Sequence, residues 1–233
     1  MLIISRQEQI LEILKRERSV SVARLAKELY ASEPTVRRDL AYLEQQGYLK
    51  RVYGGAVLGG APDREIPYDV RTGEQEDAKA VIARKAAAYL HKGDVIFLDG
   101  SSSAARMVEP ISKVEDVLVV TSGAKTAIAL AEKGVRVICT GGQMITRSFT
   151  YVGSHAETCV RAIRANTVFF SCRGLSDDGE MTDISIEEIN LRRAMLERAQ
   201  TKILLCDSSK FGKQYMYSLG YRDAIDAVIS ESD

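Results

Sequence analysis

At 233 residues the chain is too long for one small module and suits two domains, and a hydrophobic content of 45% excludes an unfolded chain. The formal net charge of zero hides an asymmetry, because residues 1–60 hold 10 of the 32 basic but only 7 of the 32 acidic side chains. A mildly basic first quarter therefore precedes a mildly acidic remainder, which fits a body that does not itself bind nucleic acid.

Three short helices are predicted near the N-terminus, because apolar side chains recur there at helical spacing. Ser32 stands at an expected N-cap, and Pro34 falls in the first turn of the third helix, where its missing N–H costs little. Gly47 ends that helix. The three apolar stripes would close a small helical core; they consist of Ile10, Ile13 and Leu14, of Val22, Leu25, Ala26 and Leu29, and of Val36, Leu40 and Leu43.

The second and third helices, joined by a tight turn, have the layout of a helix-turn-helix that reads duplex DNA. Residues 49–57 follow as two short strands around a turn, which makes the unit a winged helix-turn-helix. An arginine pair is more often a solvated helix face, but Arg37 and Arg38 lie at the exposed start of the third helix, which favours DNA contact. Asp39 is expected to orient Arg38 or to offset its charge. The side chains predicted to contact DNA are Ser32, Glu33, Thr35, Arg37, Arg38, Tyr42, Lys50, Arg51 and Tyr53.

A domain boundary is predicted where glycines, prolines and charges mix, between Gly59 and Glu76. Residues 1–58 would form the winged helix-turn-helix, residues 59–75 a linker and residues 76–233 a second domain. In that domain short apolar runs alternate with helical segments, which indicates an α/β fold with a mostly parallel sheet covered on both faces. The expected strands are 95–99, 117–121, 135–139, 168–171, 203–207 and 227–229, and the expected helices are 76–91, one from near residue 102, one from near residue 124, and 186–199.

Polar loops follow the carboxyl ends of several of these strands, where ligands bind in such folds. Small hydroxyl residues and glycines at a helix start let backbone N–H groups approach an anion. Such loops are often only caps and turns, but several on one sheet edge favour a site. The three serines after Asp99 are thus a candidate phosphate cradle, Lys210 would neutralise the phosphate, and Asp99 and Asp207 would accept hydrogen bonds from sugar hydroxyls. The candidate effector residues are Asp99, Gly100, Ser101, Ser102, Ser103, Thr121, Ser122, Gly123, Gly141, Gly142, Asp207 and Lys210.

No catalytic centre, metal site or cofactor is expected. The two histidines form no ligand cluster with the four cysteines, three of which lie in apolar runs and are predicted to be buried free thiols in a reducing compartment. Residues 176–179 are interpreted as a surface turn and His155 as structural, and neither a GxSxG nor a GxGxxG motif is present. The apolar start of the chain is short and is broken by Arg6, so no signal peptide or membrane span is expected and the protein is predicted to be cytoplasmic.

In residues 35–56 the run TVRRDL is followed by LE, then by Gly47, Leu49, Arg51 and the triplet GGA. This order and spacing resemble the DNA-binding signature of the DeoR family of bacterial transcription regulators. The body resembles the sensor domain of the same family through Asp99 with its serines, Thr121, a Gly-Gly pair at 141–142 and the segment DSSKFG at 207–212.

The resemblance implies a sensor domain related in fold to ribose-5-phosphate isomerase and coenzyme A transferases. It implies a regulator that represses a carbohydrate-metabolism operon and is released or modulated by a phosphorylated sugar. A single winged helix-turn-helix, here called a reading head, binds DNA weakly, so a homodimer or tetramer on double-stranded operator DNA is expected. The alternative is a sugar-phosphate isomerase-like enzyme with an accessory DNA-binding module, in which Asp99, Asp177, Asp178 or Glu180 would supply the general base.

Overall fold

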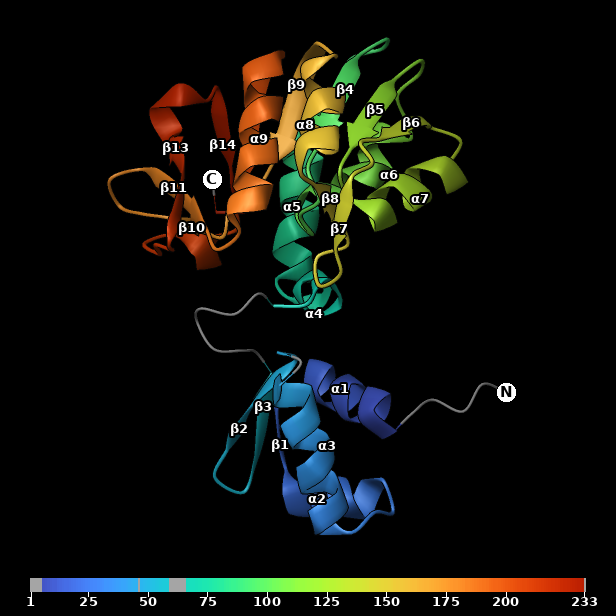
Figure 1. Ribbon diagram of the computed structural model, residues 1–233, viewed down its shortest axis with the longest axis vertical. Helices are drawn as coiled ribbons and strands as arrows, with labels where there is room; N and C mark the ends of the chain where they lie inside the picture. The colour runs from blue at the N-terminus through green and yellow to red at the C-terminus, as the bar shows by residue number, and fades with distance from the viewer. Residues whose placement is uncertain (1–5, 46, 59–65, 233) are drawn as a thin grey trace. The chain divides into compact units, whose positions relative to one another are not determined.

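The computed structural model describes residues 6–45, 47–58 and 66–232 (Figure 1). The chain falls into two compact units divided between Glu74 and Gln75. Residues 59–65 of the expected linker lie outside the described residues. The C-terminal part of the expected linker forms a short helix, α4 (Tyr68–Gly73).

The N-terminal unit packs three helices on a three-stranded antiparallel sheet with the order β1-β3-β2. The predicted apolar stripes supply its core, in which Ile10, Leu14, Leu25, Val36 and Leu40 are almost fully buried. The predicted winged helix-turn-helix is therefore confirmed. Its elements are α1 (Arg6–Glu17), β1 (Ser19–Ser21), α2 (Val22–Glu28), α3 (Glu33–Gln45), β2 (Leu49–Val52) and β3 (Gly55–Leu58).

Strand β1 was not predicted, because only Val20 of its three residues is buried. The strand forms through its pairing with β3, where Val20 lies opposite Ala56. Both positions of the Gly54–Gly55 pair require glycine. Gly54 has φ +75° in the turn between β2 and β3, and a Cβ on Gly55 would lie 2.4 Å from the Val20 carbonyl oxygen of β1. The wing is thus fastened to the segment that precedes α2.

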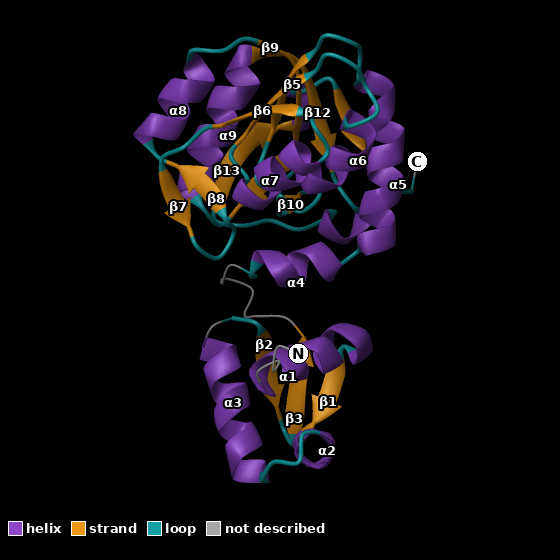
Figure 2. Cartoon of the chain, turned by 90° about the vertical axis from the view of Figure 1, so that its right-hand side faces the viewer, coloured by secondary structure: helices purple, strands orange, loops and turns teal. Residues whose placement is uncertain are grey.

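A six-stranded parallel sheet with the order β14-β12-β9-β4-β5-β6 forms the centre of the C-terminal unit (Figure 2). Helices α5, α6 and α7 pack on one face, and α8 and α9 pack on the other. The predicted α/β architecture is therefore confirmed. The elements are α5 (Glu76–Ala86), β4 (Val95–Leu98), α6 (Val108–Ile111), β5 (Leu118–Thr121), α7 (Ala124–Glu132), β6 (Arg136–Cys139), β7 (Gln143–Ile145), β8 (Thr150–Val152), α8 (Ser154–Arg161), β9 (Ala165–Phe170), β10 (Gly174–Leu175), β11 (Glu180–Asp183), α9 (Ile186–Arg198), β12 (Ala199–Leu205), β13 (Tyr217–Tyr221) and β14 (Ala227–Ile229).

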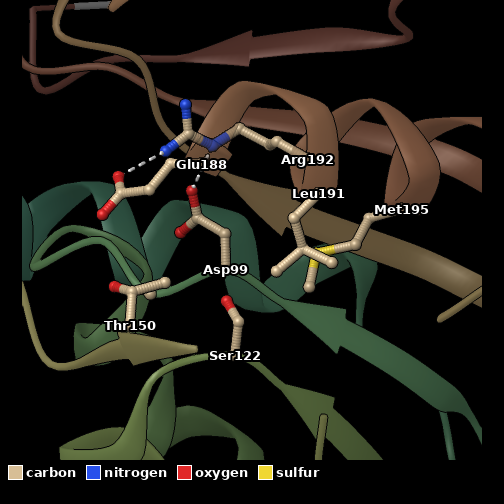
Figure 3. A pocket seen from close by; sticks show the side chains of 8 residues that line it. Asp99, Ser122, Thr150, Glu188, Leu191, Arg192 and Met195 are labelled. Atoms are coloured by element: carbon tan, nitrogen blue, oxygen red, sulfur yellow. Dashed lines mark hydrogen bonds and ion pairs between the residues drawn. The ribbon is translucent and has the colours of Figure 1, made fainter. Parts of the chain in front are cut away.

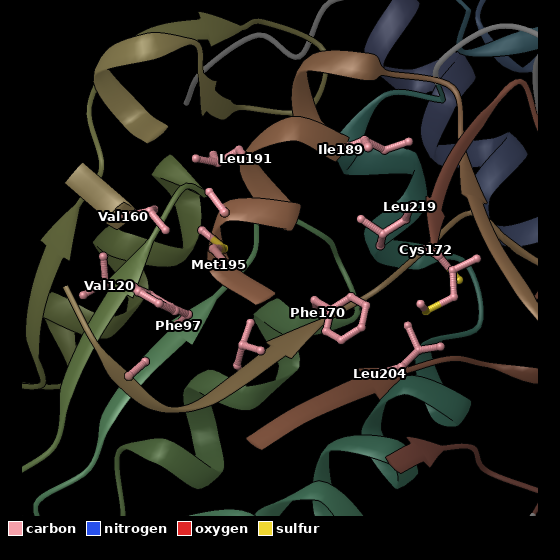
Figure 4. Packing of buried hydrophobic residues seen from close by; sticks show 14 of the residues in the cluster. Phe97, Val120, Val160, Phe170, Cys172, Ile189, Leu191, Met195, Leu204 and Leu219 are labelled. Atoms are coloured by element: carbon pink, nitrogen blue, oxygen red, sulfur yellow. The ribbon is translucent and has the colours of Figure 1, made fainter. Parts of the chain in front are cut away.

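The central strands are buried on both faces, which explains their continuous apolar runs. Phe97 belongs to the core under α8 and α9, together with Val120 and Phe170 (Figure 4). Its neighbours in β4, Ile96 and Leu98, belong to the core on the opposite face. The alternation of strand side chains therefore divides the unit into two cores.

Several elements differ from the sequence prediction. The hairpin β7–β8 and the small sheet β10-β11-β13 were missed, since their strands have only two to five residues and no clear apolar alternation. The helix expected from near residue 102 is a 3-10 turn, Ala104–Met107, followed by the four-residue α6. Cys139 is exposed rather than buried, because β6 is an edge strand of the sheet.

Candidate DNA-contact surface and anion site

Helix α3 presents a solvent-exposed face centred on Arg38. At about 100° per residue, Arg38 lies roughly opposite the buried stripe of Val36, Leu40 and Leu43. Within the described residues, its exposed guanidinium has neither a hydrogen-bond nor an ion-pair partner. Tyr42, one turn further along, is half exposed. This face therefore has side chains of the kind that reach base edges in a DNA groove.

Arg37 and Arg51 are held by carboxylates of their own unit. Arg37 pairs with Glu33, one turn earlier, at 3.1 Å. Glu44 binds Arg51 twice, accepting one bond from its Nε and one from its backbone N–H, both at 2.7 Å. Arg37 and Arg51 also line a hollow of about 230 Å³ between α3 and the wing. Glu44 thus fixes the wing against α3, and the Arg37 pair is a surface pair that contributes little to stability.

The remaining predicted DNA-contact residues divide between capping and exposure. Ser32 caps α3, since its Oγ accepts a bond from the Thr35 N–H at 3.4 Å and lies 2.8 Å from the Thr35 hydroxyl. Lys50 and Tyr53 are exposed on the wing. Tyr30, in the turn before α3, is 97% exposed with φ +49°, and no sequence pattern singles it out.

Asp39 does not orient Arg38, so the first of the two roles expected of it is wrong. Asp39 is only 7% exposed, and its carboxylate accepts hydrogen bonds from Arg6 Nε at 2.5 Å and from Gln7 Nε2 at 3.3 Å. Asp39 lies on the buried side of α3 and therefore meets α1, whereas Arg38 points to solvent. The Asp39–Arg6 pair joins the third helix to the first.

Asp99, at the end of β4, uses both carboxylate oxygens within its own fold. Oδ1 accepts two hydrogen bonds from Ser101, one from the backbone N–H at 3.0 Å and one from the side-chain hydroxyl at 2.5 Å. Oδ2 accepts bonds from the Ser171 N–H at 3.1 Å and from Arg192 Nε at 2.9 Å. Asp99 therefore organises the serine loop that follows it, residues 101–103.

Lys210 lies at the serine loop, as predicted from the sequence. Its Nζ donates to Ser103 Oγ at 3.2 Å and to Ser171 Oγ at 2.8 Å, and it pairs with Asp207 at 3.2 Å. The loop after β12 is thereby joined to the loop after β4.

A second lysine, missed in the sequence analysis, reaches the same loop. Lys79 of α5 is 4% exposed, and its Nζ donates to Ser102 Oγ at 3.1 Å. The sequence did hold a sign that Lys79 is buried, because Lys79 falls at helical spacing from Ile82, Ala83 and Ala86, which are all buried. A lysine in an apolar stripe needs a polar partner inside the protein.

Two lysines at the serine loop act on the Asp207 carboxylate. Burial acts to raise the pKa of Asp207, but Lys210, the Ser209 hydroxyl and Lys79 outweigh burial and hold that pKa below its ordinary value. Two ammonium groups thus act on one carboxylate beside three serine hydroxyls. The arrangement resembles the donor-rich surroundings that phosphate groups require.

A small cavity lies next to this loop, at the ends of β4 and β5 (Figure 3). Its volume is about 10 Å³, enough for one water molecule. Oε1 of Glu188 is buried with no hydrogen-bond partner in the described part of the chain, while Oε2 pairs with Arg192 at 3.4 Å. The lining residues are Asp99, Gly100, Ser122, Thr150, Glu188, Leu191, Arg192 and Met195.

The hairpin β7–β8 closes this cavity from one side. The Tyr151 N–H donates to the Ser122 carbonyl oxygen at 2.8 Å, which holds β8 over the end of β5. A Cβ on Gly100 would lie 2.3 Å from Thr150 Oγ1. Gly100 is therefore a glycine because the hairpin packs directly on it.

We expect Gly100→Ala to lower the free energy of unfolding of the C-terminal unit by about 1–3 kcal/mol, because the new methyl group overpacks against Thr150. Thr150→Ala removes the two nearest atoms and should restore part of the loss in the double variant. Scanning calorimetry of all four proteins measures this coupling. If the losses of the two single variants simply add, the Gly100–Thr150 contact is not the cause.

The other predicted loop residues have mainly backbone roles. The Gly123 N–H donates to Thr121 Oγ1 at 3.1 Å, which shapes the turn into α7. Of these residues only Ser122 lines the cavity. Gly141 and Gly142 have φ values of +65° and +106°, and a Cβ on Gly142 would lie 2.5 Å from a backbone carbonyl of β8. The Gly-Gly pair thus lets the hairpin pack closely.

Arg192 of α9, also missed in the sequence analysis, is buried among three carboxylates. It contacts Asp99 at 2.9 Å, Asp183 at 3.0 Å and Glu188 at 3.4 Å. Burial acts to lower the pKa of Arg192, but the three carboxylates outweigh it and raise that pKa above its ordinary value. Arg192 therefore joins β4, β11 and α9 through one cation.

Within residues 6–45, 47–58 and 66–232, no group of three or more His, Cys, Asp or Glu side chains is placed to hold a metal ion. No described helix is long and apolar enough to cross a bilayer.

Two family models match the chain. Residues 6–59 match the DeoR-like helix-turn-helix domain, and residues 74–232 match the DeoR C terminal sensor domain. Together they cover nearly the whole sequence, including the α3 surface and the serine loop.

Similar proteins span all or nearly all of the chain. The uncharacterised HTH-type transcriptional regulator YulB of Bacillus subtilis is 34% identical over 100% of this chain and 90% of its own length. HTH-type transcriptional regulator GolR of Listeria innocua is 32% identical over 97% of this chain and 90% of its own. The glycerol-3-phosphate regulon repressor of Escherichia coli is 27% identical over 97% of this chain and 90% of its own.

Solved structures align with this chain at low sequence identity. The eIF2B delta subunit of Chaetomium thermophilum aligns with a TM-score of 0.52 at 16% identity, over 98% of this chain and 72% of that chain. Ribose 5-phosphate isomerase A of Neisseria gonorrhoeae aligns with a TM-score of 0.45 at 13% identity, over 59% of this chain and 54% of that chain.

Proposed function

The chain belongs to the DeoR family of DNA-binding transcription regulators, and on that premise we propose that a phosphorylated sugar bound at its serine loop controls its binding to operator DNA. The observation that carries this proposal is the position of Lys79 and Lys210, which donate to Ser102 and Ser103. A phosphate monoester can replace these internal acceptors, since its oxygens accept stronger hydrogen bonds from ammonium and hydroxyl groups.

The names of relatives support a role as a repressor rather than an activator. One of them is named as the repressor of a glycerol-3-phosphate regulon. We extend a repressor role at a carbohydrate-metabolism operon to this chain, with a phosphorylated sugar or polyol as effector. The serine loop and its lysines would bind the phosphate, and the acceptor atoms near Glu188 would bind hydroxyl groups.

Binding requires a local rearrangement, because a cavity of about 10 Å³ is too small for a sugar. The hairpin β7–β8 and α9 form its walls, so one of them must move. Such a movement links effector to operator only if the two ligands favour different arrangements. The coupling is reciprocal and typically about 1–3 kcal/mol, so operator DNA weakens effector binding by the same factor.

A homodimer or tetramer in the cytoplasm is the form in which this regulator would act. One winged helix-turn-helix contacts one half-site, and a dimer of such domains contacts two half-sites that lie about one helical turn or a multiple apart. Sedimentation at micromolar concentration tests this. A monomer that still binds operator tightly would contradict it.

The enzyme alternative is less well supported by the site. Asp99 has both carboxylate oxygens occupied by internal donors, and Asp177 and Asp178 lie in the exposed turn between β10 and β11. Glu180, the first residue of β11, accepts a hydrogen bond from Gln214 Nε2 at 2.9 Å. A general base must have an oxygen within hydrogen-bond reach of the substrate proton. We therefore propose that the protein is not an enzyme, which turnover assays on pentose and hexose phosphates test.

A thermal-shift panel of sugar and polyol phosphates, with inorganic phosphate and unphosphorylated sugars as references, tests the effector site. A ligand at 100 times its Kd stabilises the protein by about 2.7 kcal/mol. Lys210→Met should abolish the shift, whereas Lys213→Met, which removes an exposed lysine nearby, should preserve it. An unchanged thermal shift in Lys210→Met would mean that the phosphate binds elsewhere. No shift with any of the compounds would favour a C-terminal unit that serves only for oligomerisation.

A further inference from the structure

We infer that Cys172 and Cys206 form a site of reversible oxidation, at which a hydroperoxide converts the two thiols to an intramolecular disulfide. Both cysteines are free thiols in this structure. Neither belongs to the DNA-contact surface, and neither lines the cavity near Glu188.

The strand register places the two cysteines side by side. They follow β9 and β12, which are parallel neighbours, and Phe170 of β9 lies opposite Leu204 of β12. Two residues further on, the same register sets Cys172 opposite Cys206. Neighbouring strands lie about 4.8 Å apart, and disulfides join Cα atoms about 4.4–6.8 Å apart. The backbone spacing is therefore suitable for a cross-link.

The register is held beyond the ends of the strands by a side chain. Ser171 Oγ donates to the Leu205 carbonyl oxygen at 2.5 Å, so the residues just before the two cysteines remain paired. Ser171 also donates its N–H to Asp99. Two hydrogen bonds therefore fix the residue next to Cys172 against β4 and β12.

Both thiols lie on the same face of the sheet. Side chains two residues apart along a strand share a face, so Cys172 lies on the side of Phe170 and Cys206 on the side of Leu204. All four belong to the core under α8 and α9, where Cys172 lies between Phe170, Leu204 and Leu219 (Figure 4). The two sulfur atoms therefore need no strand rotation to meet.

The surroundings give the two thiols different roles. The Cys206 thiol is the main cause that lowers the pKa of Cys172, and the charges of Lys210 and Arg192 act in the same direction against burial and Asp183. The pKa of Cys206 is raised by Cys172 and by burial. Cys172 is 5% exposed and Cys206 is fully buried. Cys172 is therefore the thiol that a peroxide meets first, since it is the less buried of the two and the one that its surroundings favour for ionisation.

The chemistry needs one equivalent of hydroperoxide. The Cys172 thiolate attacks one peroxide oxygen, the O–O bond breaks, and the products are a sulfenic acid and, for hydrogen peroxide, water once hydroxide takes up a proton. The Cys206 sulfur then attacks the Cys172 sulfur, the S–O bond breaks, and a second water leaves with the Cys206 proton. The two thiols lose two electrons, which the peroxide gains.

The cross-link would act on the anion site. Ser171 and Asp207 are immediate neighbours of the two cysteines, and both contact Lys210. A disulfide would fix the two strand ends that position this lysine. Oxidation and effector binding would therefore act on one cluster of side chains.

Peptide mapping of the full-length protein tests the inference. Trypsin leaves each cysteine in its own peptide: 137–147, 148–161, 165–173 and 203–210. After hydrogen peroxide, denaturation and alkylation, we expect peptides 165–173 and 203–210 to appear as one linked species that dithiothreitol separates. The exposed Cys139 is the internal control, since its peptide should stay alkylated or carry a sulfur oxide without joining another peptide.

Variants check the pairing. Cys172→Ser and Cys206→Ser should each abolish the linked species, and Cys139→Ser should retain it. The map of the unaltered protein decides the question even if a serine variant folds poorly. Full alkylation of Cys172 and Cys206 after peroxide treatment, or a link that includes Cys139 or Cys159, would overturn the inference.

Discussion

Replacing Arg192 by methionine is expected to lower the free energy of unfolding of the C-terminal unit by about 3–5 kcal/mol, the usual cost of removing one partner from a buried ion pair. The variant leaves Asp99, Asp183 and Glu188 buried without their shared cation. Methionine retains most of the volume of the side chain, so the loss reports charge rather than a cavity. Scanning calorimetry of the full chain measures the change in the unfolding transition.

The next residue supplies a matched control. Arg193 is exposed and donates to the Ser218 carbonyl oxygen at 2.6 Å. Arg193→Met removes an arginine from the same helix but leaves no buried carboxylate uncompensated, so a loss below about 1 kcal/mol is expected. Equal losses in the two variants would show that the buried network does not stabilise the fold in the way that its geometry indicates.

Replacing Arg38 by alanine is expected to weaken operator binding by about 1–3 kcal/mol for each reading head, and to relax base preference at one position of each half-site. The operator is first identified by sequencing genomic fragments that the protein retains at two salt concentrations. Titration of labelled operator and of random duplex then separates the two possible contacts. A base contact is lost only on operator, whereas a phosphate contact is lost equally on both.

Arg16→Ala is the matched control for charge. Arg16 is an exposed arginine of α1 that pairs with Glu17. Its replacement removes one positive charge, as Arg38→Ala does. We expect its effect on operator affinity to be smaller than that of Arg38→Ala. If the two variants lose the same affinity, the contribution of Arg38 is general electrostatics rather than contact.

The apolar pattern predicted the helical core of the first unit and the parallel sheet of the second, because burial on one face of a helix or on both faces of a parallel sheet leaves a repeat that can be read directly. Leu25 and Leu40 in the reading head, and Phe97 in the central sheet, were correctly assigned for this reason. The serine loop and Lys210 were also placed together, since parallel strands end on the same edge. The apolar pattern did not predict the short strands β1, β7, β8, β10, β11 and β13.

What the sequence could not indicate were contacts made by single polar side chains over long separations. Lys79 binds Ser102, 23 residues away, and Arg192 binds Asp99, 93 residues away. Asp39 was assigned to the adjacent Arg38 but binds Arg6, 33 residues away. A charged residue in an apolar stripe shows that a partner exists; only the folded chain identifies it.

The fastening of the wing has a practical meaning for engineering. Because β1 pairs with β3, and Glu44 holds Arg51 by two hydrogen bonds, α3 and the wing share one rigid frame. Transplanting α3 alone into a relative would set its arginines on a frame shaped by another wing. An exchange of promoter preference between such regulators should therefore move residues 6–58 as one cassette.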